Sequence, residues 1–212
     1  AIGEYAKQLA EDRRDSPGDD LTTSLVRAEL DGERLTSAEV ASFFILLVVA
    51  GNETTRNAIS HGVLALSRYP EQRDVWWANY DELAPTAVEE VVRWASPVAY
   101  MRRTTTRDIE LSGVKMAAGD KVTLWYGSAN RDESKFAEPW KFDVRRRPNP
   151  HLGFGGGGAH FCLGANLARR EITVAFEELH RRVPDIRATE EPDLLHSAFI
   201  HGIKRLPVSW TP

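Results

Sequence analysis

A glycine-rich loop around a single cysteine carries the clearest chemical signal in this sequence. The stretch from His151 to Gly164 holds six of the chain's 15 glycines, and Cys162 is the one cysteine among 212 residues. A helical pattern begins directly afterwards, at Ala165. A cysteine at a helix N-terminus lies at the positive end of the helix dipole, which stabilises its thiolate form. This placement suits a nucleophile or a soft ligand to a metal.

A nucleotide-binding loop is one alternative interpretation of the glycines. Gly153, Gly155 and Gly158 match the spacing of a dinucleotide-binding Gly-x-Gly-x-x-Gly. Such a loop should follow a buried β-strand, whereas Pro148 and Pro150 precede this one, and prolines do not build a central strand. No Gly-Lys-Ser/Thr follows, so the pattern of a P-loop is excluded as well.

A catalytic nucleophile, a haem ligand and a buried structural cysteine remain as interpretations of Cys162. As a nucleophile it would use His160 or His151 as its base, but His160 is only two residues away and no third orienting residue is recognisable. As a ligand to haem iron, the thiolate needs shielding, backbone N–H groups directed at it and glycines that let the backbone approach a flat macrocycle. Gly158 and Gly164 flank the cysteine and can meet these needs.

The loop resembles the haem-binding loop of the cytochrome P450 family, Phe-x-x-Gly-x-x-x-Cys-x-Gly. Gly158, Cys162 and Gly164 match in register, whereas Phe154 lies one residue too far upstream, so the fit requires one extra glycine. The resemblance implies haem b as the cofactor, with Cys162 as the ligand to its iron and His160 among the residues around it. It also implies the family's fold, which is mainly α-helical with small antiparallel β-sheets.

A second motif of the same family is Glu-x-x-Arg, present here as Glu90-Val-Val-Arg93. Side chains at positions i and i+3 of a helix share a face and can pair. In the family an arginine from the irregular segment before the haem loop completes the pair. Arg146 is the expected partner, with Arg145 and Arg147 as alternatives. The implied role is to brace the haem loop.

A third motif lies in a long helix expected over residues 36–68. Its middle, Phe43 to Gly51, is apolar all round, so we expect it to be buried on every side. Burying the acid Glu53 and the hydroxyl of Thr54 in such a helix costs free energy unless something compensates. A hydroxyl bond from the threonine to a carbonyl of the preceding turn would leave the acid unexplained.

The segment Ala50-Gly51-Asn52-Glu53-Thr54-Thr55 matches the family's Ala/Gly-Gly-x-Asp/Glu-Thr-Thr. The resemblance implies that Glu53 and Thr54 relay protons to dioxygen. It also implies that Ala50 and Gly51 leave room for the haem face and the oxygen.

Further contacts to haem and substrate follow from the resemblance. Arg103 and His151 match residues that pair with the haem propionates, and a bidentate arginine suits a carboxylate. Val98, Ala99 and Met101 follow the Glu-x-x-Arg helix and are expected to line an apolar substrate pocket.

The elements that must position these residues are mostly helices. Thr36 and Glu39 form a capping box for the long helix. Pro85 suits the first turn of the Glu-x-x-Arg helix, expected at about 85–95. A further helix is expected at about 165–183, after the haem loop at 151–164. Residues rich in β-branched and aromatic types predict strands at 99–106, 109–111 and 121–126, and short strands in the tail at 192–212.

Composition narrows the classes of function. A chain with 42% hydrophobic and 27% charged residues is typical of a soluble globular protein. Its net charge of -4 does not fit a nucleic-acid-binding protein, and one cysteine excludes an intramolecular disulfide. The longest apolar run, Phe43 to Gly51, is too short to span a bilayer. We therefore expect a cytoplasmic protein with no transmembrane segment and no nucleic-acid partner.

The resemblance covers essentially residues 1–212 and corresponds to the carboxyl-terminal part of the family fold, so we expect the amino-terminal half to be missing. From Asp81 to Trp210 the sequence most resembles an actinobacterial group that hydroxylates terminal carbons of methyl-branched lipids and sterol side chains. This implies a haem-thiolate monooxygenase that uses dioxygen and an apolar small-molecule substrate. Electrons would come from NAD(P)H through a ferredoxin reductase and a ferredoxin docked near Arg169 and Arg170. The alternative is a non-catalytic haem-binding fragment or remnant of such an enzyme.

Overall fold

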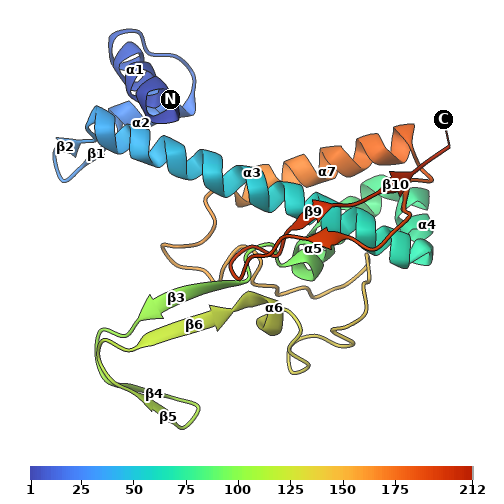
Figure 1. Cartoon of the computed structure of the whole chain (residues 1–212). Helices are drawn as coiled ribbons and strands as arrows, with labels where there is room; N and C mark the ends of the chain where they lie inside the picture. The colour runs from blue at the N-terminus through green and yellow to red at the C-terminus, as the bar shows by residue number, and fades with distance from the viewer. Residues whose placement is uncertain (212) are drawn as a thin grey trace. The chain divides into compact units, whose positions relative to one another are not determined.

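The computed structural model describes residues 1–211 and divides into two compact units. The first unit is Ala1–Glu53, and the second begins at Thr54. Helix α3 (Ser37–Arg68) contributes residues to both units, and Figure 1 shows it as the longest helix of the chain.

The first unit is built from short elements around a small apolar core. Ala10, Val26 and Val40 are its fully buried centre. Asp20 begins the second helix, because its carboxylate accepts a hydrogen bond from Thr23 N at 2.8 Å. The elements are α1 (Ile2–Asp15), α2 (Leu21–Arg27), β1 (Glu29–Leu30), β2 (Glu33–Arg34) and the first part of α3.

The expected capping box at the start of α3 is confirmed. Glu39 N donates to Thr36 Oγ1 at 3.2 Å, and Thr36 N donates to Glu39 Oε2 at 2.8 Å. Each side chain thereby satisfies a backbone N–H that has no partner within the helix. The helix begins at Ser37 because this box closes its first turn.

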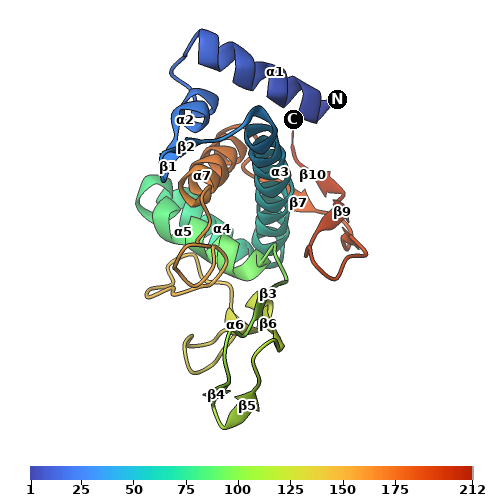
Figure 2. The ribbon, with the colours of Figure 1, turned by 90° about the vertical axis from the view of Figure 1, so that its left-hand side faces the viewer.

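The second unit holds most of the core. Its large buried side chains include Trp76, Phe142 and Phe176. Gly62 lies where three helices meet, because a Cβ there would approach Phe176 Cζ to 2.5 Å and Val91 Cγ1 to 3.1 Å. Figure 2 shows α3, α5 and α7 side by side in this region. The helices are the remainder of α3, α4 (Pro70–Ala78), α5 (Tyr80–Ala95), α6 (Tyr126–Ala129) and α7 (Ala165–Arg182).

The strands form two-stranded antiparallel pairs, in agreement with the expected small antiparallel sheets. The largest joins β3 to β6, with Tyr100 opposite Trp125 and Thr104 opposite Lys121. The pairs in the second unit are β3 (Tyr100–Thr104) with β6 (Lys121–Trp125), β4 (Ile109–Leu111) with β5 (Val114–Met116), β7 (Arg187–Ala188) with β10 (Val208–Ser209), and β8 (Asp193–Leu194) with β9 (Ile203–Arg205). The mainly helical fold class is therefore confirmed.

The start of α5 differs from the sequence expectation. The helix begins at Tyr80, and Pro85 lies inside it rather than in its first turn. The extra turn forms because Leu83 is buried in the core and its N–H donates to Asn79 O at 3.0 Å. Tyr80 also holds this turn, since its hydroxyl donates to Thr173 O of α7 at 2.5 Å. Tertiary packing here outweighs the cost of one backbone bond lost at proline.

The expectation that the apolar middle of α3 is buried on every side is wrong for the described structure. Ile45 and Val48 are about two-fifths exposed, at 41% and 40%, and Leu46 and Val49 are more exposed still, at 59% and 63%. Hydrophobicity around the whole helix predicts which side chains can be buried, but burial also needs packing partners on every side.

Helix α3 is also long and apolar enough to cross a membrane, by length and composition alone. Most of its apolar stretch is not buried within the described structure. The central helix of a globular fold passes the same test. Two observations favour that interpretation: the helix carries Glu53 and Arg56 along its length, and Ala58 and Ala65 are buried in the core of the second unit.

Candidate cofactor site around Cys162

Cys162 is half-buried at the end of the glycine-rich loop, just before α7 begins at Ala165. Its N–H donates to Phe154 O at 3.0 Å, and its carbonyl accepts from Ala165 N at 3.2 Å. Gly157 and Gly158 have φ angles of 92° and 79°, a left-handed conformation that side chains disfavour. The glycines therefore let the loop double back so that its two ends bond to each other.

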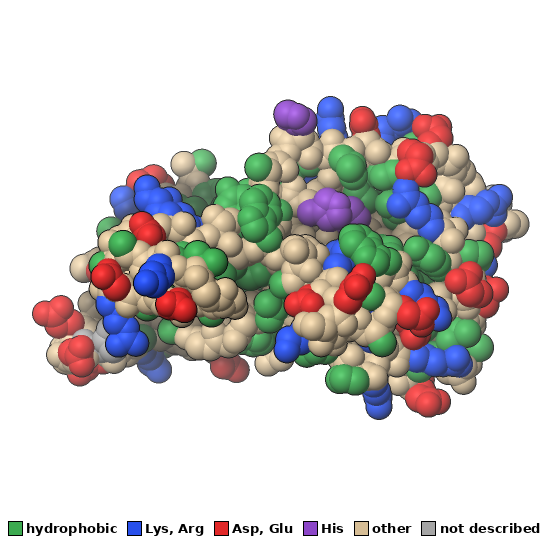
Figure 3. Space-filling model, turned by 90° about the horizontal axis from the view of Figure 1, so that it is seen from below, with side chains coloured by type: hydrophobic (Ala, Val, Ile, Leu, Met, Phe, Trp, Pro, Cys, Tyr) green, Lys and Arg blue, Asp and Glu red, His purple; other side chains and the backbone are tan. Residues whose placement is uncertain are grey.

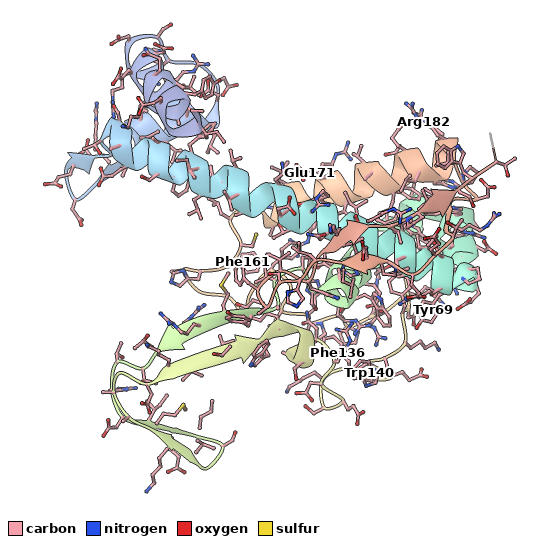
Figure 4. All side chains as sticks on the ribbon, viewed as in Figure 1. Tyr69, Phe136, Trp140, Phe161, Glu171 and Arg182 are labelled. Atoms are coloured by element: carbon pink, nitrogen blue, oxygen red, sulfur yellow. The ribbon has the colours of Figure 1, made fainter. Side chains whose placement is uncertain are left out.

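The surface around the cysteine is open and apolar. A Cβ added at Gly158 or Gly164 would meet nothing within 4 Å. Phe161 and Leu163, on either side of Cys162, are 46% and 73% exposed. Phe161 is labelled in Figure 4, where it comes from the loop that precedes α7. This surface suits contact with a flat apolar group.

The donor set fits a cofactor that needs one protein ligand. Among residues 1–211, no group of three or more His, Cys, Asp or Glu side chains could hold a metal ion. A lone sulfur at a helix N-terminus, with open glycines and exposed apolar side chains around it, is a donor that could hold the iron of a haem. His160, two residues before the sulfur, is exposed. The residues present therefore fit haem.

The structure brings Glu90, Arg93 and Arg146 together in a buried cluster. Arg93 Nε and Nη2 donate to the two oxygens of Glu90, each at 2.7 Å. Arg146 Nε lies 3.2 and 3.1 Å from the same two oxygens. Arg145 and Arg147, the alternatives to Arg146, are exposed. The cluster joins α5 to the segment before the haem loop.

The two arginines of this cluster also satisfy carbonyls of the irregular segment. Arg93 donates to the carbonyls of Asn130, Pro139 and Lys141 at 2.8–3.1 Å. Arg146 donates to Ala137, Glu138 and Lys141 at 2.7–3.1 Å. Glu90 further accepts from Asp143 N and from Asn149 Nδ2. Such a network holds a segment without regular secondary structure in one conformation.

A second acid of α5, which the sequence analysis did not single out, contacts the haem loop. Glu89 Oε2 lies 2.9 Å from His151 Nε2, and Glu89 Oε1 accepts from Arg169 Nε at 2.5 Å. Burial raises the pKa of Glu89, but the bonds from His151 and Arg169 outweigh it and lower the pKa to about 2. The carboxylate is therefore held ionised between two basic side chains.

Arg103 and His151, the expected propionate contacts, have different surroundings. Arg103 is exposed on β3, and within the described residues its guanidinium donates only to the neighbouring carbonyl of Arg102, at 3.0 Å. The side chain of His151 is 3% exposed and engages Glu89. Arg103 is thus available to bind a carboxylate from outside the protein, whereas His151 already contacts the carboxylate of Glu89.

The expected pocket residues lie beside a tail segment that the sequence analysis did not assign to the pocket. Val98 forms an isolated antiparallel bridge with Ile200, and Ala99 N donates to Phe199 O at 2.8 Å. Val98 and Ala99 are half-buried, while Met101 is 38% exposed. No local signal indicated this pairing, because about a hundred residues separate the two segments.

Two histidines hold this tail segment against the helices. His61 Nε2 lies 3.1 Å from His201 O, and His201 Nδ1 lies 2.7 Å from Ala95 O at the end of α5. The centroids of the two imidazole rings are 4.2 Å apart. Burial and the charge of His201 lower the pKa of His61 to about 4. His61 is therefore neutral at physiological pH.

The residues of the third motif fall at the division between the units. Ala50, Gly51 and Glu53 belong to the first unit and are exposed. Thr54 is the first residue of the second unit and is half-buried. The expectation that Glu53 is buried is thus wrong for the described structure. As in the apolar run before it, an apolar helix does not bury its side chains unless packing partners are present.

Comparison with known proteins gives matches over most of the chain. Residues 82–183 match the family model for cytochrome P450. A methyl-branched lipid omega-hydroxylase of Mycobacterium bovis is 78% identical over 210 residues, which are 99% of this chain and 49% of that protein. A steroid C26-monooxygenase of Rhodococcus jostii is 48% identical over 207 residues, which are 97% of this chain and 43% of that protein.

Solved structures agree. A cytochrome P450 of Mycobacterium marinum in complex with pseudoionone matches with a TM-score of 0.94 at 50% identity, over 99% of this chain and 50% of that one. The chain spans about half the length of the curated relatives it matches. Sequence, fold and the Cys162 loop thus agree, and the chain belongs to the cytochrome P450 family.

Proposed function

We propose that the protein containing this chain is a haem-thiolate monooxygenase that hydroxylates unactivated C–H bonds of an apolar substrate. The observation that carries the proposal is the lone, half-buried Cys162, held at the start of α7 by a loop whose ends bond to each other. The mycobacterial relative at 78% identity is named as a methyl-branched lipid omega-hydroxylase, and relatives at 45–48% as steroid C26-monooxygenases.

Haem b, when bound, supplies the activation of dioxygen and the one-electron chemistry. The protein's task is to hold the haem, orient the substrate and supply protons. Cys162 is the proposed ligand, and Phe154, Gly158 and Gly164 shape the loop around it. The buried Glu90–Arg93–Arg146 cluster keeps the preceding segment fixed, so the sulfur stays in one position relative to α5.

The proposed proton donors are Glu53 and Thr54. A carboxyl group and a hydroxyl one residue apart on a helix can pass a proton from solvent inward, and the exposure of Glu53 suits the solvent end of such a relay. Ala50 and Gly51 have small side chains, and a Cβ at Gly51 would meet nothing within 4 Å. These positions would leave space for haem and oxygen.

Of the two expected propionate contacts, Arg103 is exposed and is the one proposed here, whereas the side chain of His151 is 3% exposed and contacts Glu89. A guanidinium binds a carboxylate with two parallel hydrogen bonds and no change of charge. Arg103 best meets this requirement, because its only described hydrogen bond is to the neighbouring carbonyl.

The proposed substrate is a methyl-branched lipid or a sterol side chain, oxidised at its terminal carbon. The names of the relatives point to this class. Val98, Ala99 and Met101 offer an apolar wall for such a chain, next to the tail residues Phe199 and Ile200. An apolar chain would be held by burial of its surface rather than by hydrogen bonds.

Electrons would come from NAD(P)H through a ferredoxin reductase and a ferredoxin, in the cytoplasm. On the described surface drawn in Figure 3, acidic, basic and hydrophobic side chains are interspersed. An acidic ferredoxin would therefore need a local group of arginines, and Arg170, exposed on α7, is one candidate.

Product analysis tests the function and separates it from a non-catalytic haem-binding remnant. The protein from the complete reading frame would be incubated with a ferredoxin, its reductase and NADPH, and with a methyl-branched fatty acid or cholest-4-en-3-one. A terminal alcohol that depends on NADPH supports the proposal. Haem binding without any hydroxylated product would support the remnant, and product from the sterol alone would exclude the branched lipid as the substrate.

A further inference from the structure

The Cys162 loop is held by a set of contacts separate from the Glu90 cluster. Glu89 reaches it through two basic side chains. Arg169 donates from Nε at 2.5 Å and from Nη2 at 3.1 Å to the two carboxylate oxygens, and His151 Nε2 lies 2.9 Å from one of them. Glu90, the next residue, contacts a different segment. Adjacent acids of α5 therefore hold two different parts of the chain.

The hydrogen bonds fix the orientation of His151. Its Nδ1 accepts from Gly153 N at 3.0 Å, so in the neutral ring the proton is on Nε2 and is donated to Glu89. The side chain is 3% exposed. Both ring nitrogens thus have partners inside the protein, and the ring orients the backbone of the loop at Gly153.

Arg169 carries the contact from Glu89 on to the segment that holds the sulfur. Its guanidinium lies over the ring of Phe154, with Cζ 4.4 Å from the ring centroid. The carbonyl of Phe154 accepts the N–H of Cys162 at 3.0 Å. A continuous series of contacts therefore leads from Glu89 through Arg169 and Phe154 to Cys162.

At Gly153 the loop packs directly against α5. A Cβ at Gly153 would approach Val92 Cγ1 to 2.5 Å, so the backbone lies directly against the helix. Leu152 N also donates to Asn130 Oδ1 at 2.7 Å. A displacement of His151 or Arg169 would therefore be transmitted to the loop rather than absorbed by empty space.

We propose that Glu89, His151 and Arg169 form a second brace of the Cys162 loop, in which Glu89 is a positioning residue that fixes both basic side chains. The consequence for the sulfur rests on the proposed haem-thiolate function, but the brace itself is a property of the loop. It makes His151 a structural partner of Glu89 rather than a propionate contact. The brace also means that Arg169 is not a docking residue for ferredoxin, because its guanidinium binds Glu89 and lies over Phe154.

The charges of the brace agree with the geometry. The bond to Glu89 raises the pKa of the Arg169 guanidinium against the opposing effect of burial, and a negative charge on Cys162 raises it further. Arg169 therefore supplies a positive charge beside Phe154, whose carbonyl accepts the N–H of Cys162. A cation near a thiolate withdraws electron density from it and favours the reduced state of a metal bound to it.

The test compares E89Q, R169Q and the charge-conserving R169K in the protein from the complete reading frame. Glu82→Gln is the matched control on α5, since Glu82 is exposed and lies two turns before Glu89. Arg181→Gln is the control on α7, where the arginine pairs with Glu178 at the surface. Hydrogen exchange of the amides from Gly153 to Cys162 is the primary measurement, with and without haem.

Loss of one charged hydrogen-bond partner costs about 1.4 kcal/mol or more, which corresponds to about tenfold faster exchange if opening is local. E89Q and R169Q should therefore speed exchange of this segment about tenfold, while E82Q and R181Q leave it unchanged. The exchange rate in R169K should lie between that of R169Q and that of the control variants, because lysine keeps the charge but not the two parallel bonds. Loop exchange in E89Q equal to wild type would overturn the brace.

The reduction potential of the bound haem is the second measurement. R169Q should lower it, and R169K should restore most of the wild-type value, whereas a merely structural role would give both variants the same potential. If wild-type protein lacks the spectrum of a haem-thiolate but E89Q still loosens the loop, the proposed function fails and the brace stands. If wild-type protein has the spectrum of a haem-thiolate but E89Q leaves hydrogen exchange of the loop unchanged, the brace is overturned and the proposed function stands.

Discussion

Arg146 Nε lies within 3.2 Å of both carboxylate oxygens of Glu90, a residue 56 positions earlier in the chain. Both side chains are almost fully buried, at 8% and 0% exposed. A buried charge is tolerated only when it is paired and hydrogen-bonded. The contact therefore commits the segment from Asn130 to Arg146 to one position against α5, and the haem loop follows directly from it.

Removal of Arg146 should be among the most destabilising single changes in the second unit. Arg146→Met would leave the Glu90 carboxylate buried with one partner fewer, which costs about 3–5 kcal/mol of unfolding free energy. Urea unfolding of the protein from the complete reading frame measures the loss. Arg145→Met is the matched control, because Arg145 is exposed one residue away. Equal midpoints for the two variants would contradict the assigned role.

The capping box should stabilise the beginning of α3. Thr36→Ala removes the oxygen that accepts from Glu39 N, and loss of such a cap typically costs about 1 kcal/mol. Ser42→Ala, also exposed and on the same helix, is the control, since its hydroxyl only bonds back to Ala38 O. Amide exchange in residues 37–40 reports the local effect, and no change there would count against the cap.

Stability should fall between about pH 6.5 and pH 4 because of His61. Its pKa in the folded protein is lowered from 6.5 to about 4, so the unfolded state binds a proton first as the pH falls. The stabilisation is therefore complete above pH 6.5 and is lost as the pH falls through this window, by up to roughly 3 kcal/mol. Arg68, Arg131 and His201 oppose its protonation.

Unfolding free energies of wild type and His61→Asn across this range measure the effect. The variant should lack most of the wild-type slope between pH 6.5 and pH 4, since asparagine does not titrate. His196→Asn is the control, because His196 is exposed in the same tail. A slope that survives in H61N would assign the pH dependence to another group.

Glu89 should add a second loss of stability at lower pH. Its pKa is about 2 in the folded protein against 4.5 ordinarily, so the stabilisation it provides is present above pH 4.5 and is lost as the pH falls towards 2. Glu89→Gln should remove this dependence. The comparison with Glu82→Gln, measured in the same titration, separates it from the protonation of exposed carboxylates.

The local motifs were the predictable part of the site. Cys162 before a helix and Glu90 with Arg93 at i, i+3 are fixed by neighbours in the sequence, so their positions follow from spacing. The fold class follows from the helical and strand patterns in the same way. Arg146 required the resemblance to the family, because three consecutive arginines give no local reason to prefer one.

The contacts that sequence reasoning missed join distant segments. Glu89 and Arg169 are 80 residues apart, and Val98 meets Ile200 through a bridge between two irregular segments. No periodicity encodes such pairs, since they depend on how helices and loops pack. The exposure of Leu46 in α3 was also missed, because an apolar pattern records what could be buried and not what is available to bury it.

The spectrum of the reduced protein with carbon monoxide tests the central claim most directly. In the protein from the complete reading frame, wild type should show the red-shifted Soret band of a thiolate-ligated haem. Cys162→Ser should lose that band while the fold, measured by circular dichroism, is kept. A serine variant whose spectrum is the same as that of wild type would show that Cys162 is not the iron ligand.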